Sequence, residues 1–219
     1  RCGPMNNQFP AVIAALALLL SCAKETGPAR FHEDREGRRP ASFINRRAPA
    51  LELDAYHNGA MKRISLADFR GKWLVLFFYP ADFTFVCPTE LKELADFYPE
   101  FRKLGAEIAS VSTDSAYVHR AWHSQNELVK AVTYPMLSDR NGRLSRDLGV
   151  YNEEAGTAYR ASFVINPEGV IVACEIHDDA IGRSAEELLR KVSAAVTVGK
   201  GGGYCPAGWK QGEELIKAR

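Results

Sequence analysis

The sequence predicts an α/β domain in which helices cover both faces of a central mixed sheet, giving a three-layer sandwich. Residues 73–79 (WLVLFFY) are continuously apolar, as in a strand that is buried on both faces, and Pro80 ends the run. Apolar residues from Leu91 to Phe101 then recur at spacings of three and four, which is typical of an amphipathic helix. A buried strand followed at once by a helix is the repeating unit of such a fold.

The remaining elements are expected in a regular order. The first helix should begin near Cys87 and Pro88 and end by Gly105. It is followed by a strand at 106–112, a helix at 115–130, a hairpin of strands at 161–166 and 170–176, and a helix at 184–198. Alternating strands and helices place functional loops at the carboxyl ends of strands, and one such loop leads to Cys87.

Composition and charge exclude several classes of protein. Of the 219 residues, 46% are hydrophobic and 25% are charged, which excludes a disordered or fibrous chain. The 28 Lys and Arg residues nearly balance the 27 Asp and Glu residues, so the net charge of +1 gives little field to attract a phosphate backbone. We therefore expect no nucleic-acid partner.

Residues 1–40 are expected to form an N-terminal extension. The apolar run at 9–20 is shorter than the roughly 20 residues that span a bilayer, but it fits the apolar region of an export signal. Residues 19–22 (LLSC) resemble a lipoprotein cleavage box, with Cys22 as the lipidated residue. A mis-assigned start is the preferred alternative, because no basic residue lies between Met5 and the run. We expect a cytoplasmic protein, with export or membrane anchorage through Cys22 as the alternative.

The five cysteines form no C-x-x-C pair, which argues against a zinc site and suits free thiols in a reducing compartment. Cys174 lies in the strand predicted at 170–176 and is expected to be a small, buried and inert hydrophobic residue. His119 and His123 stand four residues apart on a predicted helix and could share a metal ion, but no carboxylate or cysteine completes the site. We expect neither a metal nor a cofactor.

Cys87 is the candidate nucleophile. Pro88 suits the first position of a helix, so Cys87 lies where unpaired backbone N–H groups stabilise a thiolate. Lowering a thiol pKa from about 8.5 to about 6 requires roughly 3.4 kcal/mol, whereas a helix terminus supplies at most ~2 kcal/mol. A nearby cation is therefore needed, and an Arg from elsewhere in the fold is the natural candidate. Ionisation alone gives a modest gain, so further hydrogen-bond donors are expected around the pocket.

Residues 78–91 (FYPADFTFVCPTEL) resemble the active-site segment of typical 2-Cys peroxiredoxins, of the bacterial alkyl hydroperoxide reductase C type. The P-x-x-x-T-x-x-C spacing is highly specific, and further matches lie at 112–114, 121–123, 160–164, 181–183 and 204–209. The resemblance implies a thioredoxin-like peroxidase domain at 41–198, with Cys87 as the peroxidatic cysteine and Arg160 as the cation. It also implies that Thr84 hydrogen-bonds the peroxide and that Pro80 shields the thiolate from solvent.

Glu90 has two interpretations. It could orient an arginine in the pocket, or it could be a carboxylate in the first helical turn that the helix dipole favours. A thioredoxin-type disulfide reductase, which is a rival function, would need a second cysteine at this position.

The resemblance also implies that residues 199–219 form a C-terminal arm with Cys205 as the resolving cysteine. In the family, this thiol comes from the other protomer of a homodimer, and five dimers commonly close into a decamer. Cys87 sulfenic acid, formed from hydrogen peroxide or an alkyl hydroperoxide, would condense with Cys205. An external flavoprotein disulfide reductase or a thioredoxin-like protein would then reduce the disulfide. A redox-regulated holdase chaperone or redox relay is the alternative function.

Two segments depart from the family pattern. Residues 199–204 (GKGGGY) are rich in glycine, which suggests a loose arm. Residues 151–159 (YNEEAGTAY) lack the Gly-Gly-Leu-Gly motif of easily overoxidised relatives, and no Tyr-Phe pair follows Trp209. These departures predict an enzyme that resists oxidation of Cys87 beyond sulfenic acid.

Overall fold

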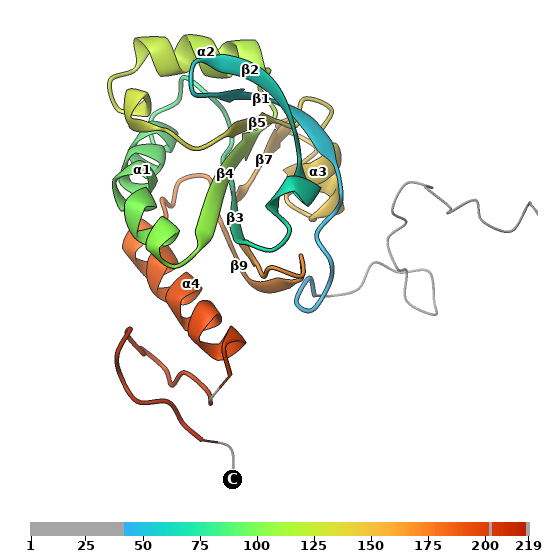
Figure 1. Cartoon of the computed structure of the whole chain (residues 1–219). Coiled ribbons are helices and arrows are strands. Elements are labelled where there is room, and N and C mark those ends of the chain that lie inside the picture. The colour runs from blue at the N-terminus through green and yellow to red at the C-terminus, as the bar shows by residue number, and fades with distance from the viewer. Residues whose placement is uncertain (1–41, 202, 218–219) are drawn as a thin grey trace, which may run out of the picture. The chain divides into compact units, whose positions relative to one another are not determined.

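A seven-stranded mixed sheet forms the centre of the computed structural model, which describes residues 42–201 and 203–217 (Figure 1). The strands lie side by side in the order β2-β1-β5-β4-β3-β8-β9. Their bounds are β1 (Glu52–His57), β2 (Ala60–Ser65), β3 (Trp73–Phe78), β4 (Ala106–Ser112), β5 (Met136–Ser138), β8 (Arg160–Ile165) and β9 (Ile171–His177). A separate two-stranded sheet consists of β6 (Tyr151–Asn152) and β7 (Thr157–Ala158).

Helices lie on both faces of this sheet. They are α1 (Cys87–Lys103), α2 (Ala116–Gln125), α3 (Arg143–Asp147) and α4 (Ala185–Gly199), with short 3-10 helices η1 (Leu66–Phe69) and η2 (Val129–Ala131). In Figure 1, α1 and α4 lie on one side of the sheet and α3 lies on the other. The expected α/β sandwich with three layers is confirmed.

Strand β3 separates two apolar cores. It pairs in parallel with β4 and antiparallel with β8. Because side chains alternate along a strand, Val75 and Phe77 enter the core beneath α1, α2 and α4, whereas Leu74 and Leu76 enter the core on the opposite face. Burial on both faces explains why the β3 sequence is continuously apolar.

Most of the elements predicted from periodicity are confirmed. The strand at 106–112 matches β4, the hairpin matches β8 and β9, and the last helix matches α4. The helix expected at 115–130 is wrong at its end, because α2 stops at Gln125. Asn126 leaves the helical conformation, and its side-chain oxygen accepts hydrogen bonds from the backbone N–H groups of Leu128 and Val129.

Cys174 differs from its expected environment. It lies on β9 as predicted, but its side chain is exposed rather than buried. Partial desolvation, followed by the charge of Glu175, raises the pKa of the Cys174 thiol. These surroundings therefore disfavour a reactive thiolate at Cys174.

The C-terminal arm packs against α4 beyond its glycine-rich start. Tyr204 and Ile216 form an antiparallel bridge across the arm. Trp209 is 2% exposed, and its carbonyl accepts a hydrogen bond of 3.1 Å from Arg190 of α4. The indole of Trp209 donates to the carbonyl of Glu213 at 3.1 Å. A buried tryptophan thus holds an arm that the glycines alone would leave loose.

The predicted export or lipoprotein segment, including Cys22, lies outside the described residues. Within 42–201 and 203–217, no helix combines the length and the apolar character needed to cross a membrane.

Candidate active site

Cys87 is the first residue of α1 and has no solvent-exposed surface. Val86 precedes it as the N-cap residue and offers no side-chain hydrogen bond to the helix. The backbone N–H groups of Thr89 and Glu90 donate to the Val86 carbonyl at 3.0 and 3.2 Å, which closes the first turn. The sulfur therefore lies at the positive end of a 17-residue helix, in surroundings that favour an anion.

Arg160 supplies a cation beside this sulfur. It is the first residue of β8, and its Nη1 lies 3.4 Å from Cys87 Sγ. The same nitrogen donates to Glu90 Oε2 at 2.7 Å, while Nε donates to the carbonyl of Asp179 at 2.8 Å. Burial opposes the charge of Arg160, but its contacts with Cys87 and Glu90 outweigh this effect and raise the pKa of the guanidinium. Arg160 is therefore a permanent positive charge fixed next to the thiol.

Glu90 lies between two guanidinium groups. It is buried one turn after Cys87, and it accepts hydrogen bonds from the backbone N–H of Arg183 at 2.8 Å and from Arg183 Nε at 3.0 Å. Burial opposes ionisation of Glu90, but the bonds from Arg183 and the charge of Arg160 outweigh it and lower the pKa of the carboxyl. Glu90 thus contacts Arg160, as the first of its two interpretations requires.

Arg183 joins Cys87, Arg160 and Glu90 in one cluster of side chains, and the sequence did not single it out. Its guanidinium is buried, donates to Ser162 Oγ at 3.1 Å and lies 3.5 Å from the centre of the Phe77 ring. Burial lowers the pKa of Arg183, although the hydrogen bonds to Glu90 act in the opposite direction. The match at residues 181–183 was the available signal, but nothing local to that segment indicates a contact with Glu90, 93 residues away in the chain.

Pro80 and Thr84 lie in the loop that joins β3 to α1. Both residues are partly buried, and Thr84 Oγ1 donates to the carbonyl of Ala81 at 2.9 Å. Between them, Phe83 adopts a left-handed backbone conformation with φ of 56°, which is uncommon for a residue other than glycine. Phe85, near the end of the loop, is 93% exposed.

Cys205 lies in the C-terminal arm and is partly buried against α4. Its sulfur is 3.8 Å from the carbonyl oxygen of Ala194. Cys87 and Cys205 are both free thiols in this single chain. Arg160 thus contacts both Cys87 and Glu90, while Cys205 lies in the C-terminal arm.

The two histidines with metal-ligand spacing have other partners. His119 Nε2 lies 3.2 Å from the carbonyl of Leu137, and His123 Nε2 lies 3.1 Å from the carbonyl of Val132. Within the part of the chain that the structure describes, no group of three His, Cys, Asp or Glu residues could hold a metal ion.

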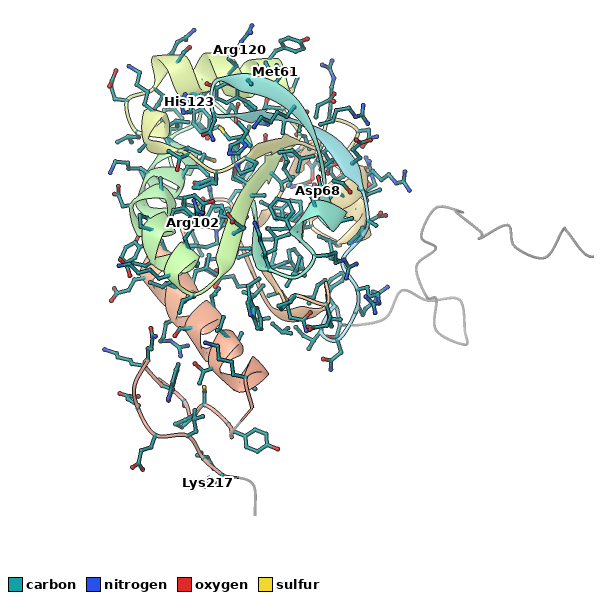
Figure 2. All side chains as sticks on the ribbon, in the orientation of Figure 1. Met61, Asp68, Arg102, Arg120, His123 and Lys217 are labelled. Atoms are coloured by element: carbon teal, nitrogen blue, oxygen red, sulfur yellow. The ribbon has the colours of Figure 1, made fainter. Side chains whose placement is uncertain are left out.

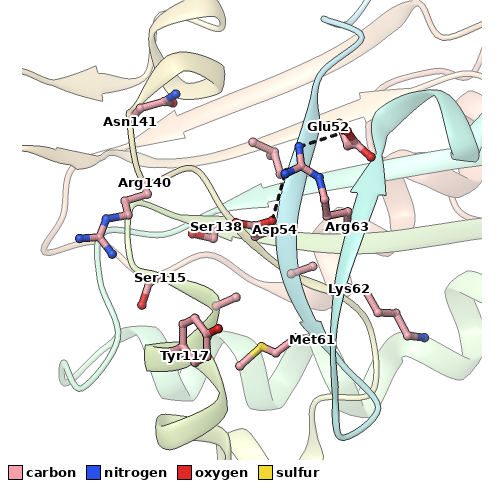
Figure 3. A pocket seen from close by; sticks show the side chains of 13 residues that line it. Glu52, Asp54, Met61, Lys62, Arg63, Ser115, Tyr117, Ser138, Arg140 and Asn141 are labelled. Carbon is pink, nitrogen blue, oxygen red and sulfur yellow. Dashed lines mark hydrogen bonds and ion pairs between the residues drawn. The ribbon is translucent and has the colours of Figure 1, made fainter.

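The surface also carries a hollow of about 770 Å³ between β1, β2 and the start of α2 (Figure 3). Arg63 crosses one side of it and lies 3.1 Å from Glu52 and 3.6 Å from Asp54. The candidate site residues described above are not among those that line this hollow. A second hollow of similar volume borders Cys205 and Trp73.

The chain is similar in sequence to a known protein family and to several named proteins. The sequence matches the AhpC/TSA family over residues 44–174. It is 46% identical to alkyl hydroperoxide reductase C of Salmonella typhimurium over 176 residues, which cover 80% of this chain and 94% of that protein. The protein of the same name from Bacillus subtilis is 43% identical over 176 residues, with the same coverage of both chains.

Solved structures give a similar result. The chain resembles the crystal structure of Enterococcus faecalis AhpC with a TM-score of 0.73 and 49% identity, over 75% of this chain and 99% of that chain. It also resembles reduced 2-Cys peroxiredoxin from Plasmodium vivax, with a TM-score of 0.76 and 31% identity, over 79% of this chain and 92% of that chain.

Proposed function

Because the chain belongs to the AhpC/TSA family and is a peroxidase of the peroxiredoxin type, we propose that it reduces hydrogen peroxide and alkyl hydroperoxides through the thiolate of Cys87. The observation that carries this proposal is the distance of 3.4 Å between Arg160 Nη1 and Cys87 Sγ. A permanent cation at hydrogen-bond distance from a buried sulfur, at the start of a helix, favours the anionic nucleophile.

In the first step, the Cys87 thiolate attacks the terminal oxygen of the peroxide. A sulfur–oxygen bond forms as the oxygen–oxygen bond breaks, so the sulfur is oxidised to sulfenic acid and the peroxide is reduced by two electrons. The departing alkoxide or hydroxide takes up a proton and leaves as an alcohol or water. Arg160 and the hydroxyl of Thr84 would hold the peroxide oxygens, and Pro80 would limit access of water to the sulfur.

In the second step, Cys205 of the partner protomer attacks the sulfenic acid, which releases water and forms an intersubunit disulfide. Cys87 is fully buried, so the first turn of α1 must open before the two sulfurs can meet. The missing side-chain cap at Val86 supports such an opening, because an uncapped helix end is the part of a helix that most easily unwinds.

This scheme requires partners that follow from the resemblance to 2-Cys peroxiredoxins. The chain would work as a homodimer, with a decamer as the larger assembly. A flavoprotein disulfide reductase or a thioredoxin-like protein would return the disulfide to two thiols by exchange. The cytoplasm is the proposed location, and export through residues 1–40 is the alternative.

A reductant-coupled peroxide assay tests the proposal. Wild type should consume peroxide, Cys87→Ser should abolish turnover, and Cys205→Ser should support one oxidation of Cys87 without an intersubunit disulfide on a non-reducing gel. Cys174→Ser serves as the matched control and should retain full turnover. Peroxide consumption by Cys87→Ser at the wild-type rate would refute the proposal. Suppression of aggregation that survives the same substitution would favour the holdase function instead.

A further inference from the structure

We infer that His119 and Asp82 form a buried hydrogen-bonded pair that positions the loop from Pro80 to Thr84 for its reaction with peroxide. The inference rests on the proposed peroxidase function. It assigns a positioning role to two residues that the proposed reaction does not otherwise use.

The pair is fully enclosed. His119 lies on α2 and Asp82 lies in the loop after β3, and both side chains have no exposed surface. His119 Nδ1 is 2.8 Å from Asp82 Oδ2, and the hydroxyl of Tyr79 donates to Asp82 Oδ1 at 2.7 Å. Both oxygens of the Asp82 carboxyl are therefore engaged inside the protein.

The hydrogen-bond partners fix the number of protons in the pair. The carbonyl of Leu137 can only accept, so His119 Nε2, at 3.2 Å from it, carries a hydrogen. A distance of 2.8 Å between Nδ1 and a carboxyl oxygen requires a second hydrogen between these two atoms. Imidazolium with carboxylate, and neutral imidazole with carboxylic acid, both have zero net charge. A net-neutral pair can be buried, whereas loss of either partner would leave a polar group stranded in the interior.

Further contacts transmit the position of the pair to the loop. The backbone N–H of Asp82 donates to Asp114 Oδ2 at 2.8 Å, just before α2 begins. Trp122 lies one turn after His119 on α2. Its ring centroid is 6.1 Å from that of Phe83 and 6.0 Å from that of Tyr79, so the three rings are packed together. Consecutive loop residues are thus held by one face of one helix.

The loop needs this restraint because of its conformation. Phe83 has a φ of 56°, a left-handed conformation that is unfavourable for a bulky side chain, so contacts that hold the loop would stabilise it. Thr84, the next residue, is the one that would hydrogen-bond the peroxide. Burial and the negative charge of Asp82 raise the pKa of Tyr79 well above its usual value, so its hydroxyl remains a donor to the pair.

The test compares His119→Leu with His123→Leu in the reduced full-length protein. His123, which is labelled in Figure 2, is the matched control. It lies one turn after His119 on α2, and its ring bonds Val132 and Tyr56 rather than the loop. In His119→Leu, we expect the rate of Cys87 oxidation by peroxide to fall at least tenfold while its alkylation by iodoacetamide does not fall. Amide hydrogen exchange at residues 81–86 should become at least tenfold faster. His123→Leu should change none of these three quantities by more than about twofold.

Asp82→Asn provides a rescue test of the same idea. Its amide can donate to Nδ1 of a neutral imidazole and still accept from Tyr79, so peroxide oxidation should stay within about threefold of wild type. Asp82→Ala removes the hydrogen-bond partner of His119 altogether and should behave like His119→Leu. If His119→Leu does not fold, Asp82→Ala takes its place in the test.

The results separate this inference from the proposed function. Failure of the wild type to consume peroxide would refute the peroxidase function. Hydrogen exchange of the loop does not depend on that activity, so it would still test the role of His119. Exchange and oxidation rates in His119→Leu that match those of His123→Leu would overturn the inference.

Discussion

Arg160 Nη1 lies 3.4 Å from Cys87 Sγ, and the same nitrogen donates a hydrogen bond to Glu90. A carboxylate that orients an arginine also weakens the positive field of that arginine. Here a second guanidinium, from Arg183, bonds the same carboxylate. Two cations and one anion leave a net charge of +1 behind the thiol, so Glu90 can hold the geometry without cancelling the field.

Loss of the Arg160 charge should make Cys87 less reactive. We expect Arg160→Gln to lower the rate of Cys87 alkylation by iodoacetamide at pH 7 by about tenfold, because a nearby cation favours the thiolate. The loss of peroxide reactivity should be larger, since the same side chain would hold the peroxide. Arg120→Gln, which removes an exposed charge on α2 beside Tyr117, is the control and should leave both rates unchanged. Equal alkylation rates in the two variants would contradict the prediction.

Glu90 should contribute strongly to stability. Glu90→Gln leaves two buried guanidinium groups without their carboxylate, and breaking such a pair costs about 3 kcal/mol of unfolding free energy. Urea denaturation of the reduced protein measures this change. Asp96→Asn removes an exposed carboxylate from the same helix and should cost less than about 0.5 kcal/mol. A loss no larger in Glu90→Gln than in Asp96→Asn would show that the cluster has no stabilising effect.

The same residue predicts a response to acid. Burial opposes ionisation of Glu90, but Arg183 and Arg160 outweigh it and lower its pKa from the usual 4.5. A folded-state pKa below the unfolded value gives stability that is present above pH 4.5 and is lost as the pH falls through the folded value. Urea denaturation between pH 7 and pH 3 should therefore show a smaller acid-induced loss for Glu90→Gln than for wild type. Parallel curves for the two proteins would exclude a contribution from Glu90.

The C-terminal arm should detach when its tryptophan is removed. Trp209→Ala deletes the buried ring and its bond to Glu213, so tryptic cleavage at Lys210 should become at least tenfold faster. Most of the change is local, so the main unfolding transition of the domain should move little. Tyr204→Ala, which removes an exposed ring from the same arm, should have a smaller effect. Unchanged cleavage in Trp209→Ala would mean that other contacts hold the arm.

Residues 151–159 lack the motif of easily overoxidised relatives, and the segment forms the short β6–β7 hairpin. We expect Cys87 to remain free of sulfinic acid at peroxide concentrations that inactivate sensitive relatives, because opening of α1 outpaces the second oxidation. Mass spectrometry of the Cys87 peptide after turnover measures this directly. Sulfinic acid at those concentrations would contradict the prediction.

Local patterns in the sequence predicted β3 and the start of α1 well, because continuous burial and helical periodicity are properties of neighbouring residues. The hairpin of β1 and β2 was missed, since its outer strand is largely exposed and carries polar residues between few apolar ones. The overlong helix at 115–130 has a different cause. The side chain of Asn126 competes for backbone N–H groups, an effect that periodicity does not register.

The candidate site was predictable to different degrees. Physical reasoning on Cys87 required a cation but could not say which one, and only the family resemblance pointed to Arg160. The contact between Glu90 and Arg183 joins residues 93 positions apart, and the pairing of His119 with Asp82 spans 37. Such contacts depend on how the sheet assembles, so no local pattern contains them.

The uncapped turn at Val86 places opposite demands on the two halves of the proposed cycle. A solvent additive or substitution that stabilises the folded turn would speed the reaction of Cys87 with peroxide. It would delay the attack of Cys205 on the sulfenic acid, the step that releases the oxygen as water. One that loosens it would do the reverse. Catalysis therefore requires that the turn populate both the folded and the opened conformation, and a substitution that favours either one alone should slow one half of the cycle.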